Sequence, residues 1–451
     1  MTKPGRFSSA KKENLPDLHS ITLKHLSTSH KIRKFANMTT QEFVSLHRND
    51  NVRILALQGA RYPEIDMAYA LDQIAGWQTA CKKLPSWSAT EGIVYPPHLS
   101  MEQCSSEQTA RYKSILASRL TANCISGKVS KFVDLTGGFG VDFSFIAKAF
   151  DSAVYVERLP HLCEAARHNF PLLGLEHAKV VEGDGTDYLL QLDQASLIFL
   201  DPARRDSNGG KTVAIGDCTP DVADLEATLV DKADVVMVKL SPMLDWHKAV
   251  EDLRNKVCEV HIVSAGGECK ELLLVLRKDF TGSPFVVCVN DNDVFAYCEG
   301  NPLQANLTGK VSEKLLPPLS VVDKENGQAC SQMHTLLIPN ASIMKAGCFN
   351  RLAAAFHIQS IGANSHIFLA NNFVNNFPGK QYAIEHVTTM NKKELKKAIA
   401  GLTQANISVR NFPLSVGDLR KRLKLKDGGD TYIFATTRGD KEHVLYICKK
   451  L

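Results

Sequence analysis

The central part of the chain alternates between short apolar runs and longer segments in which apolar residues recur with helical spacing. The apolar runs have the length and the composition of buried strands. Such alternation predicts a parallel sheet covered by helices on both faces, with ligands at the carboxyl ends of the strands. The predicted strands are KFVDL (131–135), AVYVE (153–157), AKVVE (178–182), SLIFL (196–200), DVVMVKL (234–240), VCEVHIVSA (257–265) and ELLLVLR (271–277).

The last two of these strands are joined differently from the others. Only GGECK, residues 266–270, separates them. A crossover between parallel strands needs about a dozen residues or more, so the final strand is predicted to run antiparallel. Residues 126–333 are therefore predicted to form one α/β domain with a seven-stranded sheet.

The segments before this domain have helical patterns. Apolar residues are spaced for helices over 40–81, and Pro96-Pro97 then forces an extended segment. Ser105 or Ser106 can cap the helix that leads into the first strand. Ser106 can also touch a ligand at a neighbouring nucleotide site. We expect an N-terminal helical domain over 38–125.

The pattern changes again beyond residue 279. FVVCVN and VFAYCEG predict a hairpin or an extension of the sheet edge, followed by a loop-rich connection. Residues 334–380 read as strand, helix and strand. Residues 381–451 read as strand, helix, strand, helix, strand and strand. These two segments predict small α+β domains.

Composition narrows the class of protein. With 451 residues and 44% hydrophobic content, the chain can bury the cores of several domains. The 12 cysteines include no C-x-x-C pair, which favours buried thiols in a reducing compartment over a disulfide or zinc framework. No apolar run approaches the ~18 residues of a membrane span, and no signal-peptide core is visible. We therefore expect a cytoplasmic protein with no membrane segment and no bound metal.

Positive charge is concentrated at the two ends of the chain, although the net charge of the whole is only +5. Residues 1–37 hold eight Lys or Arg against two acids, which predicts a basic flexible tail, or an upstream extension if Met38 is the natural start. Residues 381–451 hold 14 Lys or Arg against 7 Asp or Glu, a net of +7. This excess is either an electrostatic footprint for an RNA backbone or a solvated basic face.

The candidate chemistry begins directly after the first predicted strand. Thr136, Gly137, Gly138 and Gly140 follow that strand and precede a helix. Glycines let a ligand approach the backbone, and the free N–H groups of a helix N-terminus point outward. With Asp134 as an acceptor near the end of the strand, the turn predicts a nucleotide cradle.

Acidic residues follow the next strands at the same predicted edge. Glu157 ends the second strand, where an acid can accept both hydroxyls of a ribose. Gly183 and Asp184 follow the third strand in an acidic turn able to meet an adenine amino group, and Asp201-Pro202 follows the fourth. One acid in such a place is often only a helix cap or a surface charge. Acids at successive strand ends beside a glycine turn predict a nucleotide site.

These residues resemble the class I S-adenosylmethionine-dependent methyltransferases. The resemblance implies a Rossmann-like core that takes S-adenosylmethionine as its methyl donor. It also implies that 134–140 is the cofactor turn, Glu157 the ribose acid, Asp184 the adenine-side acid and Asp201-Pro202 the Asp-Pro motif. An NAD-binding domain is the competing interpretation, but Phe143 stands where the third glycine of G-x-G-x-x-G belongs. That departure favours the methyl donor.

More closely, the chain from about Thr40 is similar to bacterial class I methyltransferases that carry a C-terminal THUMP-like domain. The resemblance implies a ferredoxin-like insert over 334–380 and a THUMP-like domain over 381–451. THUMP domains in general bind RNA, whereas the substrate of this family is not established. The matching text is YPPHLSMEQCSSEQTARYK, DLTGGFGVD, LDPARRD, VKLSP, SIMKAGCF, NNFPGK and RNFPLS.

The resemblance also bears on the acceptor. In related nucleic-acid N-methyltransferases, an Asp or Asn followed by Pro-Pro and an aromatic residue binds the amino group and stacks the base. Here Ala203 and Arg204 follow Asp201-Pro202, so the sequence does not assign base N-methylation. Arg204 and Arg205 can instead hold phosphates, or they can pair with local carboxylates.

Lys239, at the end of the fifth predicted strand, can orient an acceptor or form an ion pair with Asp201. The candidate catalytic residues are thus Asp201, Pro202, Arg204 and Lys239. The sequence leads us to expect a methyltransferase that acts on RNA, either tRNA or rRNA. Two alternatives remain: a small-molecule or protein methyltransferase, and a non-catalytic RNA-binding protein with a relic nucleotide fold.

Overall fold

The computed structural model describes residues 38–122, 129–204, 215–300, 307–310, 320–321, 334–439 and 441–451. The predicted basic tail, Arg205 and the side chain of Arg204 lie outside the described part. The chain forms two compact units that divide between Gln103 and Cys104.

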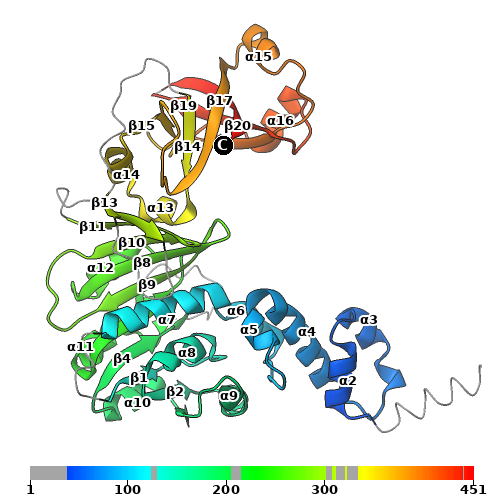
Figure 1. Ribbon diagram of the computed structural model, residues 1–451, viewed down its shortest axis with the longest axis vertical. Coiled ribbons are helices and arrows are strands. Elements are labelled where there is room, and N and C mark those ends of the chain that lie inside the picture. Colours follow the sequence, from blue (N-terminus) through cyan, green and yellow to red (C-terminus); the bar gives the residue numbers. More distant parts are fainter. Residues whose placement is uncertain are drawn as a thin grey trace, which may run out of the picture. The chain divides into compact units, whose positions relative to one another are not determined.

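The first unit is helical, as the sequence predicts (Figure 1, blue). Thr39 starts its first helix through a capping box, in which the Thr39 side chain and Glu42 each satisfy the other's backbone N–H. Phe43, Leu55 and Ile74 fill the core between the helices. The helices are α2 (Thr40–His47), α3 (Val52–Leu57), η1 (Gly59–Arg61), α4 (Met67–Lys83), α5 (Pro85–Ser88) and α6 (His98–Gln103).

The second unit is built on an eleven-stranded sheet, of which seven strands form the predicted core. The strand order is β3-β2-β1-β4-β7-β9-β8, and β9 runs antiparallel to both β7 and β8. The predicted α/β fold with an antiparallel final strand is confirmed. The bounds are β1 (Lys131–Asp134), β2 (Ser152–Glu157), β3 (Ala178–Glu182), β4 (Ala195–Leu200), β7 (Ala233–Leu240), β8 (Val257–Ala265) and β9 (Glu268–Leu276).

Four further strands extend the sheet beyond β8. β10 (Phe285–Asn290) pairs parallel to β8, and β11 (Asp293–Cys298) returns antiparallel as the predicted hairpin. The connection predicted to be loop-rich contributes β12 (Leu307–Lys310) and β13 (Ser320–Val321) to the sheet edge. A separate two-stranded ribbon joins β5 (Ala203–Arg204) to β6 (Cys218–Thr219).

Helices cover both faces of the sheet because successive strand residues point to opposite sides. In β1, Phe132 packs in one apolar cluster and Val133 in the other. The first cluster includes side chains of α7 (Glu107–Thr121), α8 (Val141–Ile146) and α9 (Pro160–Leu172), and the second those of α10 (Gly185–Gln191), α11 (Val222–Lys232) and α12 (Trp246–Asp252). Short 3₁₀ helices are η2 (Ala147–Ala149) and η3 (Ile215–Asp217).

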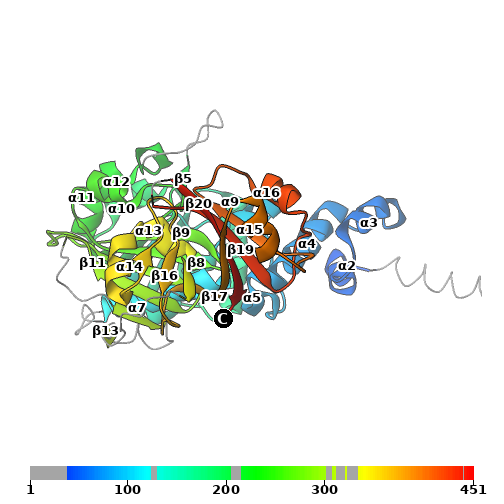
Figure 2. The same cartoon turned by 90° about the horizontal axis from the view of Figure 1, so that it is seen from above.

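The C-terminal segments form a second sheet in the order β15-β16-β14-β17-β20-β19-β18. Figure 2 labels four of its strands, β16, β17, β19 and β20. β14 lies in the predicted insert, and it pairs along its length with β17, which opens the final segment. The two segments therefore share one sheet. Their bounds are β14 (Thr335–Pro339), α13 (Ala341–Ala346), α14 (Phe349–Phe356), β15 (Gln359–Ser360), β16 (Phe368–Ala370), β17 (Gly379–Thr389), α15 (Lys392–Ala398), β18 (Asn406–Arg410), α16 (Val416–Leu423), β19 (Thr431–Arg438) and β20 (Glu442–Lys450).

The order of elements from β17 onward is the predicted one. The SIMKAGCF segment (342–349) contributes most of α13, a packed helix in which Ile343 is fully buried. No helix in the described ranges is long and apolar enough to cross a bilayer.

Candidate active site at the carboxyl ends of the parallel strands

The glycine turn after β1 is shaped by close packing. Gly138 and Gly140 have φ of +57° and +83°, a region that residues with a Cβ rarely adopt. At Gly137 an added Cβ would lie 2.2 Å from the ring of Tyr155, so no larger side chain fits. Gly140 is the N-cap residue of α8. The turn therefore brings bare backbone to the end of β1, as the sequence predicts.

Glu157, the last residue of β2, is held against this turn. Its Oε2 accepts a hydrogen bond from the Gly138 N–H at 2.8 Å, and its Oε1 accepts one from the Leu159 N–H at 2.9 Å. The side chain is only partly buried. Two backbone donors thus fix the carboxylate at the strand end while part of it stays accessible.

The turn after β3 places Asp184 as the N-cap residue of α10. Its Oδ1 accepts from the Thr186 N–H at 2.7 Å, so the capping role is present in the structure. Gly183 donates its N–H to the Glu157 carbonyl at 2.9 Å, which ties the ends of β2 and β3 together. At Gly185 a Cβ would lie 2.0 Å from the Leu135 carbonyl. That requirement for glycine is invisible in the sequence because Leu135 is distant along the chain.

Asp134 is almost fully buried at the end of β1, with 1% of its surface exposed. Its Oδ1 accepts the Thr136 N–H at 2.9 Å. Burial raises the pKa of Asp134 well above its ordinary value, and the nearby carboxylates of Asp142 and Asp201 add to this rise against the Thr136 hydrogen bond. Thr136 Oγ1 in turn accepts the Asp201 N–H at 2.6 Å, which connects the ends of β1 and β4.

Asp201 and Lys239 form the ion pair that the sequence suggests. Lys239 Nζ, at the end of β7, lies 2.5 Å from Asp201 Oδ2. The Asp201 side chain is 41% exposed and that of Lys239 12%. Burial alone would lower the pKa of Lys239, but the charges of Asp201 and Asp142 raise it above its ordinary value. Pro202 is buried beside them. Lys239 is therefore a fixed cation and not a proton acceptor.

Behind this pair lies a buried group of charges that the sequence did not reveal. Lys113 of α7 is fully buried, and its Nζ donates to both carboxylate oxygens of Glu271 in β9, at 2.5 and 2.7 Å. It also lies 3.1 Å from Asp142 Oδ1, while Asp142 Oδ2 lies 3.5 Å from Lys239 Nζ. Lys113 lies on the same face of α7 as the buried residues Leu116, Ala117 and Leu120. A lysine is rarely fully buried without an acidic partner, so this position in the sequence was the signal from which a buried ion pair could have been predicted.

Ser105, and not the predicted Ser106, is the serine before α7 that contacts these charges. Ser105 donates its Oγ hydrogen to Asp142 Oδ2 at 2.7 Å. Ser106 is the N-cap of α7 and accepts the Thr109 N–H at 3.3 Å. Its described contacts are those of a helix cap.

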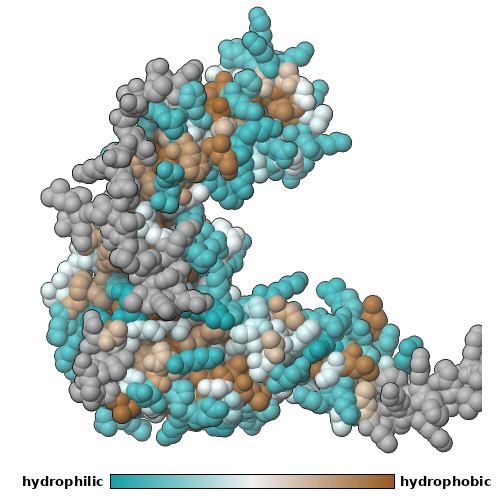
Figure 3. All heavy atoms as spheres, viewed as in Figure 1, coloured by the Kyte–Doolittle hydropathy of each residue, from teal (hydrophilic) through white to brown (hydrophobic). Residues whose placement is uncertain are grey.

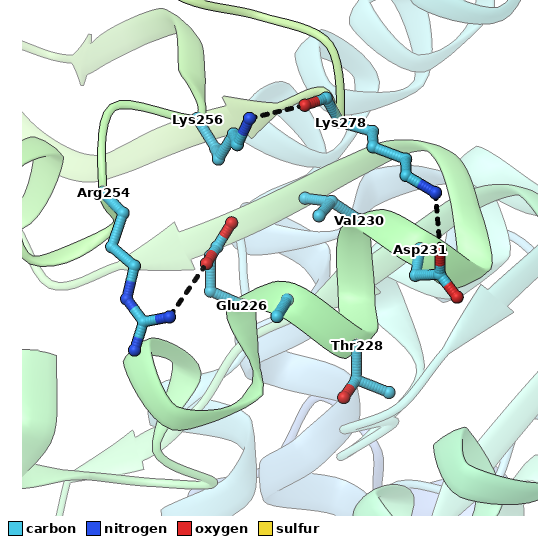
Figure 4. A pocket seen from close by; sticks show the side chains of 8 residues that line it. Glu226, Thr228, Val230, Asp231, Arg254, Lys256 and Lys278 are labelled. Carbon is cyan, nitrogen blue, oxygen red and sulfur yellow. Dashed lines mark hydrogen bonds and ion pairs between the residues drawn. The ribbon is translucent and has the colours of Figure 1, made fainter.

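A pocket also opens at the amino ends of the parallel strands, away from these residues (Figure 4). Its polar groups are already engaged with one another. Lys278 Nζ lies 2.6 Å from Asp231, Arg254 lies 3.9 Å from Glu226, and Lys256 donates to the Lys278 carbonyl at 2.7 Å. Within the described ranges, no group of His, Cys, Asp and Glu side chains is arranged to hold a metal ion.

Comparisons with known proteins agree with this architecture. A family model described as a ferredoxin-like domain matches residues 336–378, and one described as THUMP domain-like matches 379–450. The crystal structure of a predicted methyltransferase from Porphyromonas gingivalis W83 covers 91% of this chain and 97% of its own, at 29% identity and a TM-score of 0.71. An O-methyltransferase from Bacillus cereus in complex with SAH covers 46% of this chain at 10% identity and a TM-score of 0.31. A comparison with curated sequences gives no match.

The strand order of the catalytic sheet and the similarity to the Porphyromonas gingivalis structure indicate the fold of an S-adenosylmethionine-dependent methyltransferase. In its particular architecture, a ferredoxin-like segment and a THUMP-like domain follow the catalytic core, and nearly the whole chain is similar to the Porphyromonas gingivalis protein.

Proposed function

We propose that this protein transfers a methyl group from S-adenosylmethionine to RNA. The observation that carries the proposal is the meeting of three features at one sheet edge. These are the bare glycine turn, the carboxylate of Glu157 fixed beside it, and the half-exposed carboxylate of Asp201 held by Lys239. The first two suit a nucleoside and the third suits an acceptor group.

The residues present fit the methyl donor. Among the described residues, and apart from the neighbours in the chain, only the Thr136 carbonyl, at 3.8 Å, would lie within 4 Å of a Cβ at Gly138, and none would at Gly183. Each oxygen of Glu157 accepts one backbone hydrogen bond and keeps a second lone pair for a ribose hydroxyl. The donor supplies the methyl group on a sulfonium, which is a good leaving group. The protein therefore has mainly to align the reactants and exclude water.

Asp201 is the acid best placed on the acceptor side. Its side chain is 41% exposed, whereas those of Asp142 and Glu271 are 10% and 3% exposed. A carboxylate there can accept a hydrogen bond from an N–H or O–H group and so orient it for in-line attack. Lys239 holds one oxygen of Asp201 and leaves the other free for the substrate.

The THUMP-like domain supplies the surface for RNA. Leu395 of α15 and Leu419 and Leu423 of α16 pack on the same face of its sheet, so both helices belong to one layer. The view in Figure 3 shows a hydrophilic surface around α15. The outward positions of this layer carry exposed cations, none of which forms an ion pair with another described residue: Lys392, Lys393, Lys396, Lys397, Lys421, Arg422, Lys424 and Lys426. We name these eight residues the basic layer. Its charge density suits a phosphate backbone.

The donor half of the proposal is tested by calorimetric titration of the protein with S-adenosylmethionine. We expect measurable binding heat and competition by S-adenosylhomocysteine. Absence of both would reject the donor assignment whatever the acceptor is.

The acceptor half is tested by incubating the protein with labelled S-adenosylmethionine and total bacterial RNA. We expect label in RNA, and mass spectrometry of the nucleosides then identifies the modified base or ribose. Transfer to a metabolite or protein extract, with no transfer to RNA, would instead support the small-molecule or protein alternative. Binding of RNA without transfer to any acceptor would support the relic fold.

A further inference from the structure

Five ionisable side chains form a continuous line from the protein interior to the acceptor side. In the order of their contacts, the side chains are 3% exposed for Glu271, 0% for Lys113, 10% for Asp142, 12% for Lys239 and 41% for Asp201. The members come from five elements: α7, β9, α8, β7 and the end of β4. A line of charges this deeply buried is costly unless every member has a partner.

The two lysines are not shared equally among the three carboxylates. With all five groups ionised, two cations face three carboxylates, a net charge of −1. Lys113 serves both Glu271 and Asp142, and Lys239 serves both Asp142 and Asp201. Lys239 interacts more closely with Asp201 than with Asp142, because its Nζ lies 2.5 Å from Asp201 and 3.5 Å from Asp142.

Lys113 explains this uneven division. Its Nζ forms an ion pair with Asp142 Oδ1 at 3.1 Å, and Ser105 donates a hydrogen bond to Asp142 Oδ2, the oxygen that faces Lys239, at 2.7 Å. The charge of Asp142 is thus balanced from the interior, and Lys239 can lie closer to Asp201. Without Lys113, the buried carboxylate of Asp142 would have only Lys239 as a cation among the described residues. An unpaired buried charge costs more than an unpaired half-exposed one, so Lys239 would be drawn inward.

We infer that Lys113 is a positioning residue for methyl transfer. Because Lys113 balances the charge of Asp142, Lys239 stays paired with Asp201. This pairing fixes the position of the Asp201 carboxylate, which faces the acceptor. The inference rests on the acceptor-side role of Asp201 proposed above. Lys113 itself is fully buried, behind Asp142 and Glu271.

The surroundings agree with this assignment. Burial works against ionisation of Asp142, yet Lys113 and Lys239 together lower its pKa below the ordinary value. Burial raises the pKa of Glu271, and the same two lysines oppose that rise. Asp134, from β1, is the other acid that faces Asp142 and Asp201. The two lysines therefore favour the ionised form of Asp142 and oppose the effect of burial on Glu271.

The test separates stability from positioning. Lys113→Met alone leaves two buried carboxylates short of a partner, so we expect a lower melting temperature and impaired folding. Lys113→Met/Glu271→Met replaces a buried ion pair by apolar side chains and restores the net charge of −1, so its melting temperature should return close to that of the wild type. Its Asp142, however, still lacks Lys113.

In the double variant we expect kcat for methyl transfer to stay about 10- to 100-fold below the wild type, the effect of a misplaced reacting group, while the Kd for S-adenosylmethionine changes less than about twofold. The matched control is Lys278→Met/Asp231→Met, which removes another ion pair of the catalytic domain, away from α7 and Asp201. The control should leave kcat unchanged. Recovery of kcat together with stability in Lys113→Met/Glu271→Met would overturn the inference.

A crystal structure of the double variant provides a readout that needs no acceptor. We expect Lys239 Nζ to lie closer to Asp142 than to Asp201, the reverse of the present arrangement. An unchanged Lys239–Asp201 pair would refute the positioning role even if RNA is methylated. Failure of the wild type to methylate RNA would reject the proposed acceptor and leave this structural comparison valid.

Discussion

At the scale of single residues, the structure separates acids that look alike in the sequence. Asp134 and Glu157 lie at the ends of predicted strands, and Asp184 and Asp201 follow predicted strands. Asp134 is buried with a raised pKa, Asp184 caps a helix, Glu157 is fixed by two backbone donors, and Asp201 is paired with a lysine. The four acids therefore differ in burial and in hydrogen-bond partners, and we expect them to have different roles.

The proposed ribose contact gives the first prediction. Glu157→Gln keeps the shape of the side chain and removes its charge, and we expect the Kd for S-adenosylmethionine to rise about 10- to 100-fold, the size of hydrogen bonds to a charged group. Calorimetry measures this change. Glu182→Gln, at the end of the adjacent strand, is the matched control and should leave the Kd unchanged. Equal affinities for both variants would remove Glu157 from the donor site.

Asp201 gives the second prediction. Asp201→Asn can no longer accept a proton or hold Lys239 by charge, so we expect kcat to fall about 100-fold or more with donor affinity nearly unchanged. The measurement is initial-rate kinetics alongside calorimetry. A variant that binds the donor and turns over at the wild-type rate would argue for the relic fold or for a different acceptor residue.

At the scale of the secondary-structure elements, the docking of α7 on the sheet depends on a buried histidine. His261 of β8 is fully buried, with Nδ1 at 2.6 Å from Tyr112 Oη and Nε2 at 2.9 Å from Glu259 Oε2. Arg119, also from α7, forms a two-pronged ion pair with Glu259. Burial lowers the pKa of His261, against the raising effect of Glu259.

This arrangement predicts a pH dependence of stability. A histidine with a lowered folded-state pKa binds fewer protons folded than unfolded, so its contribution is present above the unfolded value of about 6.5 and is lost as pH falls below it. The pKa of Glu259 is lowered to about 2, so its own contribution is lost only below about 4.5. We expect the melting temperature to fall between pH 6.5 and 5, and His261→Gln to flatten that slope. An equally steep slope in the variant would contradict the assignment.

The sequence predicted these elements better than it predicted the contacts between them. Strand periodicity and the short GGECK link were sufficient for the catalytic sheet, including its antiparallel strand, because both are local properties of the chain. The Lys113–Glu271 pair joins residues 158 positions apart, and the tight fit of Gly185 depends on Leu135. Patterns along the chain carry no such information. The roles of the individual site residues remain predictions.

At the scale of the whole molecule, charge is unevenly distributed. Residues 381–451 carry a net of +7, while the whole chain carries +5. The basic layer is therefore the part of the described surface where we expect RNA to bind. Binding through it would depend steeply on salt, since each neutralised phosphate releases counterions.

The corresponding prediction uses charge reversal. Lys393→Glu/Lys397→Glu places two acids on one side of α15, and we expect weaker RNA binding together with a shallower dependence of log K on log salt. Lys179→Glu/Lys248→Glu, which makes the same charge change on exposed sites of the catalytic domain, is the matched control. Filter binding over a salt series measures both. Identical slopes for the two variants would indicate that the basic layer does not contact RNA.

The pairing of β14 with β17 has a practical consequence for anyone who shortens this chain. A cut after residue 378 would look natural from the family boundaries, yet it would remove β17, the neighbour of β14, and leave backbone N–H and C=O groups of β14 unpaired and open to other chains. If such a fragment failed to bind RNA, aggregation would explain the loss as well as the removal of a contact with RNA. Point replacements on the intact protein are the sound way to ask what the last seventy or so residues recognise.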